Sequence, residues 1–211
     1  MAALVPDAKL IALLREPVDR AYSHYWSRRS WDAEARSFEQ ALAEEDGSTP
    51  PGLAYAARGR YLEQLERVLQ HYPREQLLVL LFDDLAARPI ETFAEVCRFL
   101  SADDTVRPEI VGNRFNVNHR RRSSRLRRAM ERTRAWRWAP TLADRVDAWN
   151  NVPVNYPKLE PQRRDALREL FVDDNLRLAA WLGRDLSAWL PSARTTALPA
   201  EAGDAEPSSQ A

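Results

Sequence analysis

The sequence contains few of the residues from which covalent cross-links, metal sites and glycine-rich loops are built. Its 211 residues include one cysteine, Cys97, which excludes an intramolecular disulfide and a cysteine-based zinc site. Only three histidines are present and they are scattered along the chain, so we expect no bound metal: His24, His71 and His119. Six isolated glycines exclude a phosphate-binding loop of the Walker or dinucleotide type.

Long hydrophobic runs and a leader-like start are also missing. No apolar run reaches the ~18 residues that a membrane span needs. Residues 1–14 lack the basic segment and the small-residue cleavage site of a signal peptide, so we expect a cytoplasmic protein. Hydrophobic residues make up 45% of the chain and charged residues 29%, which is enough to bury a core. The length predicts one domain.

Lysine is scarce and arginine is clustered. Only Lys9 and Lys158 are lysine among 31 basic residues, and the net charge is zero. Segment 107–137 holds eleven arginines against Glu109 and Glu131, a local charge of about +9 that attracts anions. The planar guanidinium binds phosphate and sulfate through two parallel hydrogen bonds. A GC-rich genome would explain arginine in place of lysine throughout, but it does not explain the clustering.

Hydrophobic periodicity predicts an α/β protein. Two short apolar runs, 8–14 and 76–82, indicate buried parallel strands. Helical spacing predicts helices at 18–29, 37–45, 55–72, 89–100 and 160–182, with Ser37 and Gly183 as caps. In helix 89–100 the residues expected to face inward are Phe93, Val96, Phe99 and Leu100.

The remaining segments are basic, irregular or of low complexity. Segments 122–137 and 141–149 predict a basic and a mixed helix, while 106–119 and 152–157 predict loop or extended chain. Residues 193–211 are rich in Ala, Pro, Ser and Glu, which predicts a disordered tail after a domain spanning 1–192. The order of elements indicates a parallel sheet with helices on both faces. Two strands make a poor core, so we expect the sheet to be incomplete.

The most informative stretch follows the first predicted strand. Arg15 stands at the carboxyl end of that strand, the edge of an α/β sheet where ligands bind. Pro17 begins a helix whose N-terminus favours an anion, and Ser23 offers a hydroxyl less than two turns further along. Together they predict a phosphate site. In the alternative interpretation Arg15 pairs with Asp19 or Glu16, and Ser23 only caps a turn.

Residues 14–25, L-R-E-P-V-D-R-A-Y-S-H-Y, resemble the 3′-phosphate-binding motif of sulfotransferases. These enzymes use 3′-phosphoadenosine 5′-phosphosulfate (PAPS) as the sulfuryl donor. The resemblance implies that Arg15 and Ser23 hold the 3′-phosphate of PAPS, and that the chain has the P-loop-NTPase-like sulfotransferase fold. Segments 58–65, 73–85, 156–159 and 182–189 are also similar to the carbohydrate-type and bacterial members, so the resemblance runs from about residue 4 to residue 189.

The sequence departs from the family pattern at its start. The family opens with a strand, a lysine-containing phosphosulfate loop and a general base, whereas only fourteen residues precede Arg15 here. The chain therefore resembles the latter part of such a domain, without the N-terminal strand and the phosphosulfate loop. No catalytic base can be named, and we expect this truncated chain to be inactive or impaired.

Two further groups of residues are expected near the ligands. Members of the family hold the nucleotide with a second loop. Segment 112–122 stands at the corresponding position, but its sequence differs from the family pattern. Arg120, Arg121 and Arg122 are expected to bind the nucleotide phosphates there and to lie over the Arg15 end of the strand. The alternative is a solvated basic helix start. Arg60 and Tyr61 are expected on the acceptor side.

The resemblance implies a transferase that moves a sulfuryl group from PAPS to a hydroxyl or amine acceptor, with carbohydrate favoured and without a metal. One alternative is a non-catalytic module in which the arginine-rich segment binds a polyanion or nucleic acid, although no nucleic-acid-binding signature accompanies it. Another is a relative of nucleotide kinases, which share a phosphate site at the end of a strand. The missing Walker loop argues against that relationship.

Overall fold

A computed structural model describes residues 3–31, 33–108, 119–121, 145–146, 149, 151–153 and 156–195. Two parallel strands, β1 (Leu10–Leu14) and β2 (Leu77–Leu81), pair in register, with Leu10 opposite Leu77 and Leu14 opposite Leu81. The parallel sheet and both predicted strands are confirmed, each strand shorter than expected. A second pair is antiparallel, β3 (His119–Arg121) with β4 (Asn151–Pro153), in segments predicted as loop and extended chain.

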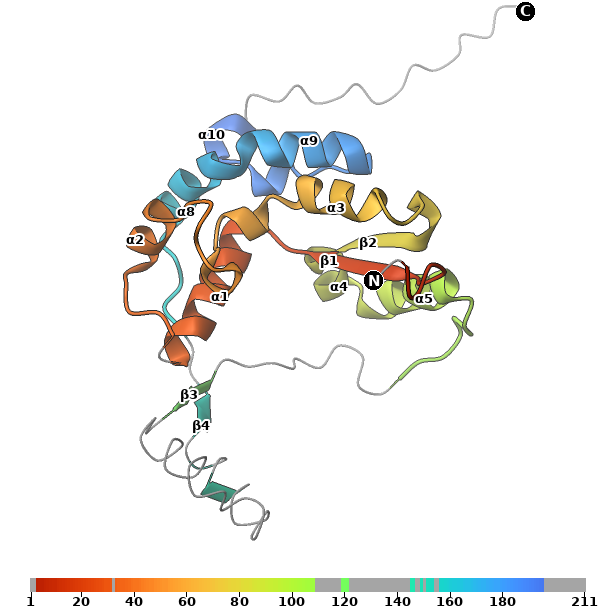
Figure 1. Cartoon of the computed structure of the whole chain (residues 1–211), viewed down its shortest axis with the longest axis horizontal. Helices are drawn as coiled ribbons and strands as arrows, with labels where there is room; N and C mark the ends of the chain where they lie inside the picture. Colours follow the sequence, from red (N-terminus) through yellow and green to blue (C-terminus); the bar gives the residue numbers. More distant parts are fainter. Residues whose placement is uncertain are drawn as a thin grey trace, which may run out of the picture.

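Helices surround the parallel sheet. They are α1 (Pro17–Ser30), α2 (Phe38–Ala43), α3 (Tyr61–Leu69), α4 (Phe82–Ala87), α5 (Pro89–Leu100), α8 (Pro161–Arg168), α9 (Val172–Leu182) and α10 (Ser192–Thr195). Short 3₁₀ turns are η1 (Pro51–Leu53), η2 (Ala57–Gly59), η3 (Arg74–Gln76), η5 (Glu169–Phe171) and η6 (Ser187–Trp189). Helices α3 and α9 cover one face of the sheet and α4 and α5 the other (Figure 1). No helix in the described part of the chain is long and apolar enough to cross a membrane.

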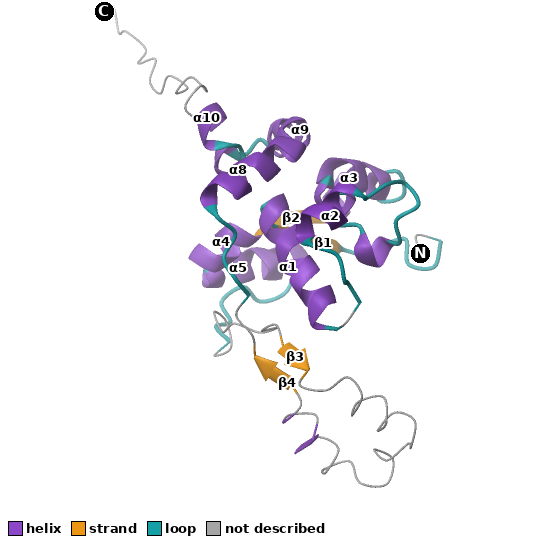
Figure 2. Ribbon diagram, turned by 90° about the vertical axis from the view of Figure 1, so that its left-hand side faces the viewer, coloured by secondary structure: helices purple, strands orange, loops and turns teal. Residues whose placement is uncertain are grey.

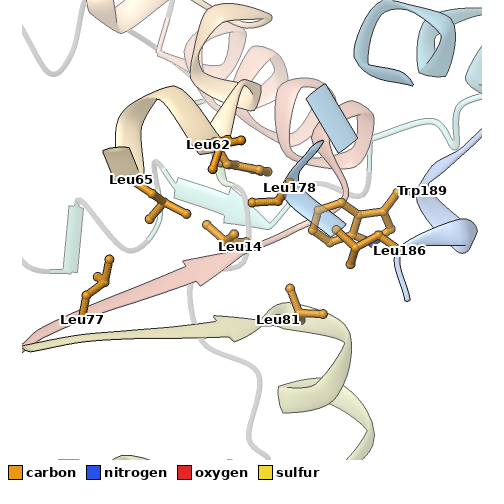
Figure 3. Close-up of a cluster of buried hydrophobic side chains, with 9 residues drawn as sticks. Leu14, Leu62, Leu65, Leu77, Leu81, Leu178, Leu186 and Trp189 are labelled. Carbon is orange, nitrogen blue, oxygen red and sulfur yellow. The ribbon is translucent and has the colours of Figure 1, made fainter. Parts of the chain in front are cut away.

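The main core joins the two halves of the chain (Figure 3). Leucines of β1, β2 and α3 pack against Leu178 of α9 and against Leu186 and Trp189 near the end of the described chain. A smaller cluster lies between α1, α2 and the loop before α3, where Tyr25, Phe38 and Tyr55 are buried together. Burying apolar surface in both places stabilises the fold by roughly 25 cal/mol for each Å² removed from water.

Two predicted helices have different bounds in the structure. The predicted helix 55–72 starts only at Tyr61, because Tyr55 turns into the cluster under α1 and residues 57–59 form η2. The predicted helix 160–182 is broken by η5, where the buried Phe171 packs against Gly59. Gly183 ends α9 with φ of 62°, the left-handed cap that the sequence predicts.

Helix α5 has the predicted bounds but a different buried face. Its fully buried residues are Thr92, Ala94 and Cys97, whereas Leu100, predicted to face inward, is 45% exposed. The helix packs on α4 and β2, and its fully buried side chains are small. The Ser37 cap of α2 is confirmed as a full capping box with Gln40.

Candidate functional site

Arg15 follows β1 directly and lies at the carboxyl edge of the parallel sheet. Its guanidinium carbon lies 5.1 Å from the centre of the Phe82 ring, and Phe82 follows β2 at the same edge. Its carbonyl oxygen accepts a 2.6 Å hydrogen bond from the Tyr61 hydroxyl at the start of α3. The backbone of Arg15 is therefore fixed, and an aromatic face supports its charged end.

The acidic neighbours of Arg15 are paired with arginines from α8. Glu16 is buried and lies 3.4 Å from Arg168, while Asp19 lies 2.8 Å from Arg164. The interpretation in which Arg15 pairs with one of these acids is therefore wrong. Within the described part of the chain, no carboxylate forms an ion pair with Arg15. Its guanidinium lies instead over the Phe82 ring at the carboxyl edge of the sheet.

The N-terminus of α1 is capped by the protein itself. The Glu16 carboxylate accepts a 2.6 Å hydrogen bond from the backbone N–H of Asp19. Burial raises the pKa of Glu16, against the opposing effects of that N–H and of Arg168. The sequence predicted that this helix end favours an anion, and the anion present there is Glu16. A phosphate at this edge would rely on side chains instead of the free N–H groups of α1.

Ser23 lies half-buried on α1, six residues after Pro17. At 1.5 Å per residue, the two positions are about 9 Å apart along the helix axis. Among the residues that the structure describes, none forms a hydrogen bond with the Ser23 hydroxyl. Arg15 precedes α1 and Ser23 lies within it, and their sharing of one phosphate stays a prediction.

The two residues expected on the acceptor side are both held by the protein. Tyr61 is buried, its hydroxyl binds the Arg15 carbonyl, and burial raises its pKa. Arg60 is half exposed, with its Nε atom 3.4 Å from a carboxylate oxygen of Asp174 on α9. Tyr61 therefore positions Arg15. A contact of either residue with an acceptor stays a prediction.

The arginines predicted to share the nucleotide lie partly outside the described residues. The backbone of Arg120 and Arg121 forms β3, which packs beside the C-terminal end of α1, whereas Arg15 precedes its N-terminal end (Figures 1 and 2). Their side chains, and Arg122 as a whole, are outside the described residues. Their contact with nucleotide phosphates stays a prediction.

Lys9 is placed far from this edge. It precedes β1, and its ammonium donates hydrogen bonds to the Phe99 carbonyl at 2.5 Å and to Ser101 Oγ at 3.0 Å. These bonds close the C-terminal end of α5.

Two features of the site were not predicted from the sequence: the contact of Arg15 with Phe82, and the ion pairs that the α8 arginines make with Glu16 and Asp19. The first could have been predicted, because Phe82 follows a parallel strand whose end lies beside that of β1. No sequence pattern indicates the second.

The comparisons with known proteins agree with this geometry. A family model described as "Sulfotransferase domain" matches residues 2–145. A bifunctional heparan sulfate N-deacetylase/N-sulfotransferase of Drosophila melanogaster is 36% identical over 106 residues, covering 46% of this chain and 10% of that protein. The human N-deacetylase/N-sulfotransferase 3 is 35% identical over 108 residues, covering 47% of this chain and 12% of that protein.

A solved structure extends the match in three dimensions. The crystal structure of a sulfotransferase from Alicyclobacillus acidocaldarius matches with a TM-score of 0.61 and 29% identity, over 90% of this chain and 60% of that chain. The chain spans about a tenth of the length of the curated relatives named above. The fold is that of the sulfotransferases, a P-loop-NTPase-like α/β architecture, and the chain belongs to the sulfotransferase domain family.

Proposed function

We propose that this domain binds PAPS by its 3′-phosphate and serves the transfer of the sulfuryl group to a hydroxyl or amine acceptor. The observation that supports this most is the guanidinium of Arg15 at the carboxyl edge of the sheet, which forms no ion pair with any acid in the described ranges. The two acids next to it in the sequence, Glu16 and Asp19, instead form ion pairs with Arg168 and Arg164. Membership of the sulfotransferase family favours PAPS as the sulfuryl donor, and the named relatives favour a carbohydrate acceptor.

The chain's own residues would act mainly by positioning. Arg15 would donate two parallel hydrogen bonds to the 3′-phosphate, and Ser23 would donate a third from its hydroxyl. Tyr61 and Phe82 hold Arg15 in place before the ligand arrives. When bound, PAPS supplies an activated sulfuryl group whose transfer depends on alignment and charge stabilisation, much as phosphoryl transfer does. The comparisons give no support to an arginine-rich module without chemistry.

Calorimetry with two nucleotides tests the assignment. Arg15→Ala should weaken binding of adenosine 3′,5′-bisphosphate about ten-fold or more, since a charge-assisted hydrogen bond contributes roughly 1.5–3 kcal/mol. Binding of AMP, which lacks the 3′-phosphate, should hardly change. Arg67→Ala is the matched control, because Arg67 is exposed on α3 and donates only to the Glu63 carbonyl. Equal losses for both nucleotides would show that Arg15 does not hold the 3′-phosphate.

A further inference from the structure

One flank of α1 gathers three guanidinium groups around a single imidazole. Arg20, His24 and Arg28 are four residues apart and therefore share one stripe of the helix. Arg58 of η2 approaches from the loop before α3 and acts electrostatically on both Arg20 and His24. We call Arg20, Arg28 and Arg58 the arginine cluster. No member forms an ion pair with an acid in the described ranges.

Neutral groups hold two members of the arginine cluster, Arg20 and Arg28, in place. Arg20 donates from Nη2 to the Tyr55 carbonyl, and its Nε is buried with no partner within the described structure. Arg28 donates from Nε to His24 Nε2 at 3.4 Å. Its guanidinium also lies against Gly52, where an added Cβ would meet Nη2 at 2.9 Å. The charges of Arg20 and Arg28 are thus fixed in position without being neutralised by an acid that the structure describes, and Arg58 adds an exposed charge beside them.

The nearest acid is engaged elsewhere. Glu45 attracts Arg20, but its carboxylate accepts hydrogen bonds from the backbone N–H groups of Ala56 at 2.7 Å and Ala57 at 2.6 Å. Those bonds anchor the loop that carries Arg58. Glu45 acts on Arg20 but forms no ion pair with it in the described part of the chain. Burial, followed by Arg58, Arg20 and Arg28, lowers the pKa of His24 to about 4, so the imidazole between them is neutral at pH 7.

The arginine cluster borders the proposed nucleotide site. Arg20 lies three residues before Ser23, so the two side chains are neighbours on α1. Arg20 also interacts with Tyr61, whose hydroxyl binds the Arg15 carbonyl. An anion held by the cluster would therefore lie next to the bound nucleotide without competing for Arg15. A second molecule, the acceptor, is the ligand that must occupy such a neighbouring position.

We propose that Arg20, Arg28 and Arg58 form an anion subsite that takes a carboxylate or sulfate group of the acceptor. The identification of the ligand as an acceptor rests on the proposed function; the anion subsite itself rests on the arginine cluster. Fixed guanidiniums without acidic partners bind such groups through charge-assisted hydrogen bonds. Acceptors that carry an anionic group are then preferred over neutral ones of the same shape.

Inorganic sulfate is the first probe, titrated into full-length protein that is already saturated with adenosine 3′,5′-bisphosphate. Saturation fills the Arg15 site, so the remaining response reports the cluster. NMR of the His24 imidazole should show a saturable shift, and the pKa of His24 should rise because the anion offsets the arginine charges. Arg58→Ala should weaken this sulfate binding about five-fold. Arg58 is exposed, so the variant should fold, and Arg67→Ala should bind like the unmodified protein.

Further titrations distinguish anionic from neutral ligands, and the Arg15 site from the arginine cluster. Glucuronate and glucose 6-sulfate should reproduce the His24 response, whereas glucose should not. Arg15→Ala should weaken bisphosphate binding about ten-fold or more and keep the sulfate response. Sulfate binding by a protein that binds no bisphosphate would overturn the nucleotide assignment and leave the subsite standing. An unsaturable His24 response, equal sulfate affinity in Arg58→Ala, or equal binding of glucose would overturn the subsite.

Discussion

The role of a single residue in this fold depends on how its neighbours are paired and packed. Arg15 has no acidic partner among the described residues, because arginines of α8 pair with Glu16 and Asp19. At Gly59, the neighbouring side chains determine that only glycine fits. It is buried in η2, and an added Cβ would lie 2.8 Å from the Phe171 ring and 3.2 Å from Pro17. Both neighbours are buried and have little freedom to move.

Gly59→Ala should therefore destabilise the protein. Overpacking of this kind costs about 1–3 kcal/mol of the free energy of unfolding, which urea denaturation measures. Gly47→Ala is the matched control, because no atom lies within 4 Å of the Cβ it would add. If both substitutions change the unfolding free energy equally, the contact with Phe171 is not limiting.

His24 should make stability depend on pH below neutrality. Its pKa is about 4 in the folded protein and near 6.5 in the unfolded chain. Between these values the unfolded state binds the proton more strongly, so stability falls as pH drops from about 7 to 4. His24→Gln should flatten this part of the pH profile of urea unfolding. An unchanged slope would mean that other groups cause it.

Glu34 acts in a lower pH window. Its hydrogen bonds with Arg36, aided by one from Tyr55, lower the pKa of Glu34 to about 2. A carboxyl with a lowered folded pKa stabilises the fold above its unfolded value and loses that contribution as pH falls toward 2. The two windows separate the effects of His24 and Glu34 in one titration.

At the scale of elements, ion pairs attach α8 to α1. Arg168 and Glu16 are both largely buried, whereas Arg163 pairs with Glu39 on α2 and both are more than half exposed. Breaking a buried pair leaves one charge unpaired, so Arg168→Ala should cost about 3–5 kcal/mol of unfolding free energy. Arg163→Ala should cost no more than about 1 kcal/mol.

The same substitution should affect ligand binding. Without Arg168, the Glu16 carboxylate is free to compete for the adjacent Arg15, so the affinity for adenosine 3′,5′-bisphosphate should fall. Calorimetry on Arg168→Ala and Arg163→Ala, both checked for folding by circular dichroism, measures this. Unchanged affinity in a folded Arg168→Ala protein would show that Arg15 is independent of α8.

Local sequence signals predicted the elements whose structure is determined locally. The apolar runs placed β1 and β2, and the Ser37 capping box and Gly183 placed helix ends. Tertiary contacts decided the rest. Tyr55 interrupts the predicted helix 55–72 because it is buried against α1, and Phe171 interrupts 160–182 where it meets Gly59. No short-range pattern in either segment encodes these contacts.

The candidate site also combines features that local sequence predicts with features that only tertiary contacts determine. The motif around Arg15 and Ser23 is contiguous, so its spacing and resemblance were enough to select both residues. The pairing of Arg168 with Glu16 joins positions 152 residues apart, and the approach of Arg58 to α1 depends on a loop. Neither follows from periodicity. The sequence therefore predicts a ligand site at this edge, and the structure was needed to show that Glu16 and Asp19 are paired with arginines of α8.

At the scale of the whole molecule, the position of lysine bears on turnover. Lys9, the one lysine before Arg15, closes α5 at the other end of β1 from Arg15. We therefore expect Lys9 not to stabilise leaving-group charge, so Lys9→Ala should leave the transfer of labelled sulfate from PAPS unchanged. A lower transfer rate in a folded Lys9→Ala protein would contradict this and would assign that role to Lys9.

The core drawn in Figure 3 also determines when the protein can fold during its synthesis. Leu14 and Leu77 leave the ribosome long before Leu178 and Trp189, which complete the same core. At translation rates of about 5–20 residues per second, the leucine face of β1, β2 and α3 stays open for several seconds. A nascent chain stalled before Leu178 should therefore remain sensitive to protease and bind chaperones, and both properties should disappear once Trp189 has emerged.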